Sequence, residues 1–279
     1  SLNHFLPFNS RLIDHLAWRL GQFKCKLVVC DIAPLGIVVA RAAGVPSVLV
    51  ENFTWDWIYQ GYQRDEPRFA DAIAYLRGAF PAADYHIQTE PVCRYGAADL
   101  ITAPISRAPR LSRQATREKL GIPRAAKAVL ITMGGIPGEY DFLHRLQEQR
   151  GVYFVIPGNG ARTRRNGNLV LLPHRSEFYH PDLVNACDAV IGKLGYSTVA
   201  EVYRAGMPLG YVSRARFRES AVMARFVRRQ MSGVAISEAQ FQRGDWLHHL
   251  PDLLALPRVR GREANGAVQV ARFIAKLQT

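Results

Sequence analysis

Residues 190–209, VIGKLGYSTVAEVYRAGMPL, constrain the fold of this chain more than any other segment. They predict a buried strand, a glycine-rich turn, a helix that stops at a glycine, and then the next strand. Such a unit belongs to a parallel α/β sheet, and its turn places a helix N-terminus where a phosphate group can bind. The glycines let the backbone approach that ligand closely. The residues expected around the ligand are Gly192, Lys193, Gly195, Ser197 and Thr198.

The same segment also has an interpretation without a ligand. Thr198 and Glu201 are three residues apart, which is the spacing of a capping box that stabilises a helix N-terminus by itself. Short glycine motifs also occur often by chance. The segment alone therefore leaves both interpretations open.

Strands and helices alternate along the rest of the chain. Four short apolar runs precede a basic, proline-containing stretch at 104–126, and six follow it. Strands that alternate with helices form parallel sheets covered on both faces. We therefore predict two Rossmann-like, doubly wound α/β domains, at 1–122 and 123–279. The first has fewer strands and opens with a helix, so we predict that it is incomplete at its N-terminus.

The chain of 279 residues is strongly basic, with a formal net charge of +13. This charge is typical of a protein that binds a nucleic acid, a phosphorylated substrate or an anionic membrane surface. An arginine-rich composition with the charges on solvated faces explains it as well. No zinc-finger spacing, RNA-recognition signature or KH loop is present, so we expect no nucleic-acid partner. Peripheral contact with an anionic membrane stays open. The basic clusters are at 107–124, 162–165 and 214–229.

Cysteine usage and hydropathy bear on the compartment. The four cysteines are scattered and form no CxxC pair, so we expect reduced thiols and a cytoplasmic protein. No apolar run approaches the roughly 20 residues of a membrane span. The N-terminus lacks the layout of a secretory signal.

Polar groups follow three strands of the second domain at their carboxyl ends, where open α/β sheets bind ligands. Together they suit a phosphate group with attached hydroxyls, because Glu201 or Glu219 can accept hydrogen bonds from sugar hydroxyls. Taken singly, each has a structural explanation, such as a tight turn or favourable charge at a helix N-terminus. They are Gly134 and Gly135 after the first strand, the turn 192–195 after the second, and Arg214 and Glu219 after the third.

The first domain offers a second group of residues at strand ends. Asp31 ends one strand, and Asn52, Trp55 and Asp56 follow the next. An acid and aromatic rings can hold a sugar or a nucleobase. Alternatively, Trp55 packs in an interface and Asp56 caps a helix.

These residues resemble a known family. The block IGKLGYSTVAEVYRAGMPL resembles the donor-binding segment of GT-B glycosyltransferases, and TMGG at 132–135 is similar to the first turn of their C-terminal domain. The string PSVLVENFTWDWIYQGY at 46–62 is similar to the glycosyltransferase-like N-terminal region of plant L-arabinose kinases and their stand-alone bacterial relatives. The resemblance covers roughly residues 7–235.

The resemblance implies a nucleotide-sugar co-substrate, a UDP-sugar, bound by the second domain, with no cofactor and no metal. Glu201 matches the glutamate that contacts the ribose, and Glu219 is nearest to the residue that contacts the donor sugar. Lys193, Arg214 and the helix N-terminus would stabilise the departing diphosphate. The glycines implied near the diphosphate are Gly134, Gly135, Gly192 and Gly195.

The resemblance does not identify the acceptor, which would bind on the first domain. Asn52 and Trp55 are its expected contacts, and Asp31 or Asp56 the expected catalytic base. Many such enzymes carry a glycine-rich first loop, and this sequence has none. The alternatives are therefore a nucleotide-sugar-binding module without turnover, and an epimerase on the same fold.

Overall fold

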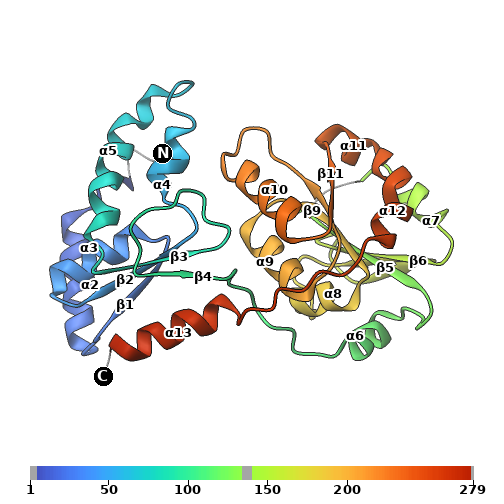
Figure 1. The fold of residues 1–279 in the computed structure, drawn as a ribbon, viewed down its shortest axis with the longest axis horizontal. Helices are drawn as coiled ribbons and strands as arrows, with labels where there is room; N and C mark the ends of the chain where they lie inside the picture. Colours follow the sequence, from blue (N-terminus) through green and yellow to red (C-terminus); the bar gives the residue numbers. More distant parts are fainter. Residues whose placement is uncertain (1–4, 134–139, 278–279) are drawn as a thin grey trace. The chain divides into compact units, whose positions relative to one another are not determined.

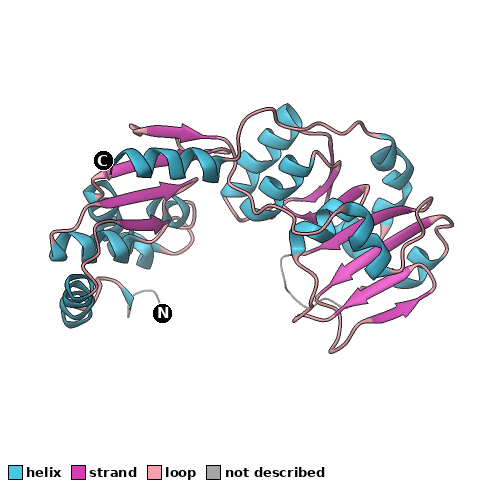
Figure 2. Ribbon diagram, turned by 90° about the horizontal axis from the view of Figure 1, so that it is seen from below, coloured by secondary structure: helices cyan, strands magenta, loops and turns pink. Residues whose placement is uncertain are grey.

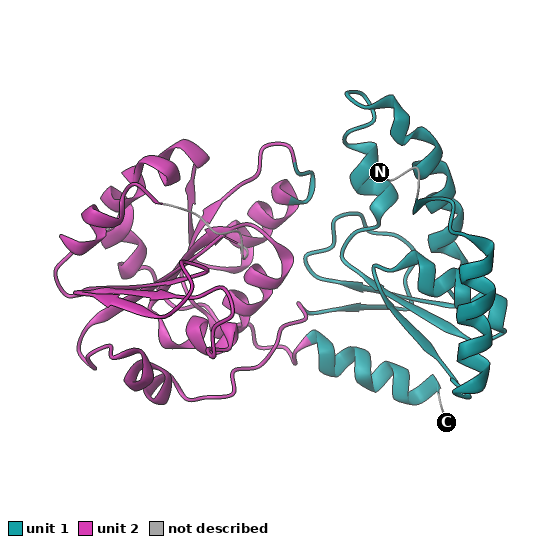
Figure 3. Ribbon diagram, turned by 180° about the vertical axis from the view of Figure 1, so that it is seen from behind, with its two compact units in different colours: residues 1–103, 217–219, 266–279 teal, residues 104–216, 220–265 magenta. Residues whose placement is uncertain are grey.

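The structure, a computed structural model, describes residues 5–133 and 140–277 (Figure 1). Two compact units make up the chain, each with its own parallel sheet (Figure 3). Unit 1 comprises residues 1–103, 217–219 and 266–279, and unit 2 comprises residues 104–216 and 220–265.

Unit 2 contains a seven-stranded sheet with the order β11-β10-β9-β5-β6-β8-β7, in which only β7 is antiparallel to its neighbour. All six predicted strands are present. The strands are β5 (Lys127–Thr132), β6 (Val152–Pro157), β7 (Arg164–Asn166), β8 (Leu169–Leu172), β9 (Ala189–Lys193), β10 (Leu209–Val212) and β11 (Gly233–Ile236).

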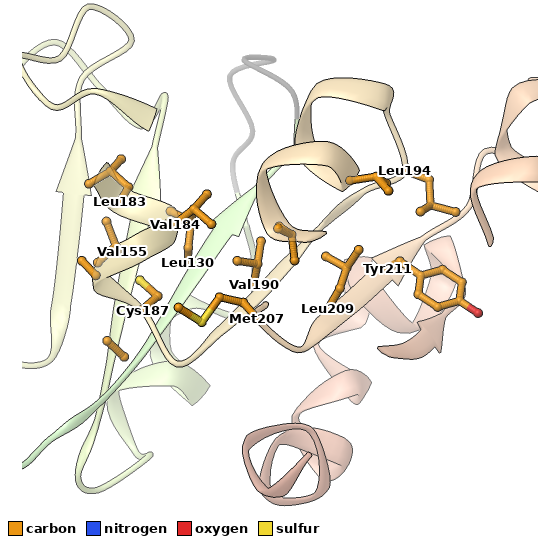
Figure 4. Close-up of a cluster of buried hydrophobic side chains, with 14 of the residues drawn as sticks. Leu130, Val155, Leu183, Val184, Cys187, Val190, Leu194, Met207, Leu209 and Tyr211 are labelled. Carbon is orange, nitrogen blue, oxygen red and sulfur yellow. The ribbon is translucent and has the colours of Figure 1, made fainter. Parts of the chain in front are cut away.

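Both faces of this sheet are buried under helices, as the continuous apolar strands predict (Figure 2). Along β5, Ala128 and Leu130 enter one core, whereas Val129 and Ile131 enter the other. Figure 4 shows the first core, where Leu130 and Val190 of neighbouring strands lie near side chains of α8. The first core includes residues of α6 (Arg113–Leu120), α8 (His180–Ala186), α9 (Tyr196–Ala205) and α10 (Glu219–Gln230); the second includes residues of α7 (Leu143–Gln147), α11 (Glu238–Arg243), η3 (Asp245–His249) and α12 (Leu250–Ala255).

Unit 1 contains a four-stranded parallel sheet with the order β1-β2-β3-β4. Cys30 and Leu49 on one face pack with Ile37 and Leu76 from the helices. The strands are β1 (Val28–Asp31), β2 (Ser47–Glu51), β3 (Tyr85–Thr89) and β4 (Leu100–Thr102); the helices are α2 (Ser10–Gln22), α3 (Pro34–Ala43), α4 (Trp55–Gln60), η1 (Pro67–Phe69), α5 (Ala70–Ala79), η2 (Phe80–Ala82) and α13 (Gly266–Leu277).

The basic stretch that the sequence indicates as a linker is fastened along unit 2. The Ile105 amide donates to the Tyr196 hydroxyl at 2.9 Å, and the Arg110 and Leu111 amides donate to one carboxylate oxygen of Asp182. The Ser112 hydroxyl then caps α6. Residues 104–122, which the sequence assigns to the end of the first domain, are therefore counted with unit 2.

The described residues contain neither a membrane-spanning helix nor a cluster of metal ligands. None of the helices in these residues has the length and apolar character needed to cross a membrane. Within the same residues, no group of three His, Cys, Asp or Glu side chains is arranged to hold a metal ion. Within the same part of the chain, Cys25, Cys30, Cys93 and Cys187 form no disulfide.

Candidate functional site

The order of strands in unit 2 locates its binding edge. β5 lies between β6 on one side and β9 on the other, so the direction of winding reverses beside β5. Open α/β sheets bind ligands at the carboxyl ends of strands at such a reversal. Thr132 ends β5 and pairs in register with Gly192, and Lys193 ends β9 opposite Val212. The predicted strand ends thus meet at one edge, while Gly134 and Gly135 lie outside the described residues.

Gly192 is explained by the neighbouring strand. A Cβ atom built on it would lie 2.6 Å from the carbonyl oxygen of Thr132, closer than a real Cβ contact. The glycine that was expected to make room for a ligand therefore makes room for β5. Gly195 has open space around its Cβ position, since no atom of the described residues, its two chain neighbours aside, lies within 4 Å.

These surroundings predict opposite outcomes for the two glycines of the turn. We expect Gly192→Ala to destabilise unit 2 by about 1–3 kcal/mol, because overpacking between strands forces the backbone apart. Gly195→Ala is the matched control; it replaces a favoured N-cap residue without a clash, so it should cost less than about 1 kcal/mol. Chemical denaturation of both variants tests this, and equal stabilities would contradict the steric explanation.

Helix α9 begins without a side-chain cap. Its N-cap residue is Gly195, and Thr198 lies inside the first turn. The capping-box interpretation of Thr198 and Glu201 is therefore wrong. Because the N-cap residue is a glycine, it supplies no side-chain acceptor for the first-turn N–H groups, which an anion could provide instead.

Glu201 is a buried carboxylate with charged and polar partners. Its side chain is 3% exposed, and its Oε1 atom lies 2.9 Å from Nε and 2.8 Å from Nη2 of Arg107. Its Oε2 atom lies 2.6 Å from Nδ1 of His180. Because an ionised carboxylate only accepts, Nδ1 carries the hydrogen, and Nε2 of His180 lies 3.4 Å from the Thr132 hydroxyl.

The linker and the loop before α8 meet beside this carboxylate. The guanidinium groups of Arg107 and Arg110 lie 5.1 Å and 4.0 Å from the ring centroid of Tyr179. Tyr179 directly precedes His180. An aromatic ring, two cations and a buried acid thus share one end of the sheet.

Positive charge gathers at the next strand ends. Burial lowers the pKa of Lys193, and the neighbouring charge of Arg214 lowers it further. The Arg214 guanidinium donates to the carbonyl of Leu194 at 3.5 Å. A bound anion would relieve the repulsion between these cations, so the turn favours a negatively charged ligand.

The structure brings two predicted residues together within unit 1. The side-chain amide of Asn52 donates to Oε1 of Glu219 at 3.0 Å, and both residues are buried. The adjoining Arg218 lies over the Trp57 ring, 4.1 Å from its centroid, and donates to the Trp57 carbonyl. The resemblance implies that Glu219 lies near a donor sugar and Asn52 near the acceptor. In this structure the Glu219 carboxylate accepts a hydrogen bond from Asn52.

The two acids expected as catalytic base have different surroundings. Asp31 is exposed at the end of β1. Asp56 is buried in the first turn of α4, where the N-cap position belongs to Thr54, so the alternative that Asp56 caps a helix is wrong. Trp55 stacks on Tyr59 with 5.7 Å between ring centroids.

Sequence reasoning missed the partners of Glu201. Arg107 stands out in the sequence only as one charge of the basic cluster 107–124, and His180 is not among the predicted site residues. Their separations from Glu201, 94 and 21 residues, carry no periodic signal. Only the order of the strands brings these segments together.

Two proteins are similar to this chain in sequence. The chain is 27% identical over 272 residues to L-arabinokinase of Arabidopsis thaliana, across 96% of this chain and 26% of that protein. It is 25% identical over 284 residues to an uncharacterized glycosyltransferase of Methanopyrus kandleri, across 90% and 75% of the two chains. The chain thus spans about a quarter of the first relative and three quarters of the second.

Solved structures share the fold at low identity. Spinosyn forosaminyltransferase SpnP matches with a TM-score of 0.65 and 18% identity, over 96% of this chain and 80% of that one. Arabidopsis thaliana UGT89C1, solved with UDP, matches with a TM-score of 0.64 and 15% identity, over 96% and 77%. The predicted pair of Rossmann-like domains of GT-B type is therefore confirmed.

The family follows from a match that spans most of the chain. The model of glycosyl transferase family 1 matches residues 4–251. This confirms the resemblance drawn from the turn at 192–195 and the string at 46–62. The chain belongs to glycosyl transferase family 1.

Proposed function

We propose that this protein transfers a sugar from a nucleoside diphosphate donor, a UDP-sugar, to an acceptor hydroxyl. The observation that carries the proposal is Glu201. It is a buried carboxylate in α9, a helix whose N-cap residue is a glycine. His180 links it to Thr132 at the end of β5, where the winding of the sheet reverses. A carboxylate accepts two hydrogen bonds from a vicinal diol, which the ribose of a nucleotide presents.

The cationic end of the site suits the diphosphate. Lys193 and Arg214 supply positive charge, and the first turn of α9 supplies N–H donors around Ser197 and Thr198. Charge on the diphosphate grows as the bond to the sugar breaks, so donors fixed beforehand stabilise the transition state. These groups make the proposed reaction independent of a bound metal.

Further support comes from the relatives. UGT89C1, whose fold this chain shares, was solved with UDP. Under the proposal, unit 1 provides acceptor contacts through Asn52 and Trp55, and Asp31 or Asp56 takes the acceptor proton. The four cysteines, which form no disulfide in the described residues, suit the cytoplasm, where we place the protein.

Calorimetry followed by a turnover assay tests the proposal. We expect UDP to bind the full chain, and UDP-sugars to release UDP when a productive acceptor is added. Binding without release for any acceptor would favour a binding module without turnover. Conversion of the UDP-sugar without acceptor would favour an epimerase. No binding of UDP or dTDP at millimolar concentration would overturn the donor site.

A further inference from the structure

Arg107 covers the carboxylate on which the proposed function depends. The Glu201 side chain is 3% exposed, whereas the Arg107 side chain above it is 55% exposed. Two nitrogens of the guanidinium, Nε and Nη2, converge on the single oxygen Oε1. Solvent therefore reaches the arginine and hardly reaches the acid beneath it.

Most of the positions at which the Glu201 carboxylate can accept a hydrogen bond are already occupied. An ionised carboxylate has about four lone-pair positions. Arg107 occupies two through Nε and Nη2, and His180 occupies one on Oε2. A ribose diol needs two acceptor positions, so it cannot be satisfied while both partners stay in place.

Arg107 is the partner that can leave at low cost. Ion pairs with a half-exposed member are weak, and its long side chain can be solvated elsewhere. His180 is more enclosed, with 26% of its side chain exposed, and its second nitrogen contacts Thr132. The backbone on both sides of Arg107 is anchored, through Ile105 to Tyr196 and through Arg110 to Asp182. The displacement therefore involves the side chain and leaves the linker in place.

We propose that Arg107 is a gate that competes with the nucleotide ribose for Glu201, an inference that rests on the proposed function. With the gate closed, Arg107 neutralises the buried acid. With nucleotide bound, the diol replaces the guanidinium. A site that must first open binds its ligand with an apparent affinity reduced by the open fraction. Arg107 thereby sets the affinity for the donor without being required for its recognition.

The test measures UDP binding to the full chain by calorimetry, with stopped-flow association rates. Arg107→Ala and Arg107→Met remove the competing charge, and the second keeps most of the side-chain length. We expect the Kd for UDP to fall by about three- to tenfold in both, with faster association. Arg110→Ala is the matched control, because Arg110 contacts the same Tyr179 ring while only its backbone bonds to Asp182. Its Kd should stay within about twofold of wild type.

Several results would overturn the gate. If the Kd for UDP rises or stays unchanged in both folded Arg107 variants, competition is excluded. If Arg110→Ala lowers the Kd for UDP as much as the Arg107 variants do, a role specific to Glu201 is excluded. Thermal unfolding confirms that each variant is folded. If wild type binds UDP and Glu201→Ala weakens it while Arg107→Ala does nothing, the gate alone fails. If no variant binds UDP or dTDP, the donor site fails and the gate with it.

Discussion

Glu201→Ala is expected to weaken UDP binding by about 1.5–3 kcal/mol, roughly a 10- to 150-fold rise in Kd, because hydrogen bonds to a charged group are worth this much. The loss arises from the carboxylate that would accept the ribose hydroxyls. Titration calorimetry on wild type and variant measures it directly.

The same substitution should change stability much less than binding. His180 loses the Glu201 oxygen that its Nδ1 atom contacts, whereas the half-exposed Arg107 side chain can be solvated by water. We expect a stability loss of about 1–2 kcal/mol. Glu238→Ala is the control, since Glu238 is an exposed acid at the start of α11 and should leave UDP affinity unchanged. Unchanged UDP affinity in a folded Glu201→Ala variant would assign Glu201 a purely structural role.

Much of the fold could be predicted because burial on both faces leaves continuous apolar strands. β6 is an example, since its sequence VYFVIP at 152–157 is continuously apolar. β7 was missed because it is a three-residue edge strand of exposed polar residues, Arg164–Asn166. Helix α11 was also missed, although Ser237 and Gln240 form a capping box that the sequence displays.

The sequence indicates where the candidate site lies, and it indicates only some of the residues that surround it. Strand ends and the α9 turn follow from local pattern, because each lies within one βα unit. The surroundings of Glu201 do not, because Arg107 and His180 reach it from other elements. Local spacing even favoured a capping box, and the helix start at Tyr196 excludes it. Tertiary hydrogen bonds decide which acid is a cap and which is a buried acceptor.

The largest stability effect is expected at the opposite, amino end of β9. Asp188 accepts the Ala128 amide at 2.9 Å and pairs with Arg113 at 2.9 Å, Arg117 at 3.5 Å and Arg258 at 3.5 Å. Arg117 is buried, and its Nε atom has no hydrogen-bond partner within the described residues. One carboxylate therefore joins α6, the sheet and the chain after α12.

Asp188→Ala should destabilise unit 2 by about 3 kcal/mol, because it removes the carboxylate that faces the buried guanidinium of Arg117. Chemical denaturation and calorimetry measure this loss. Asp245→Ala is the matched control, since that carboxylate is 36% exposed and pairs with the 65% exposed Arg243. Its cost should stay below about 1 kcal/mol. Equal losses in the two variants would show that the arginines around Asp188 are held by backbone carbonyls alone, such as that of Ala186, which Arg117 contacts at 3.1 Å.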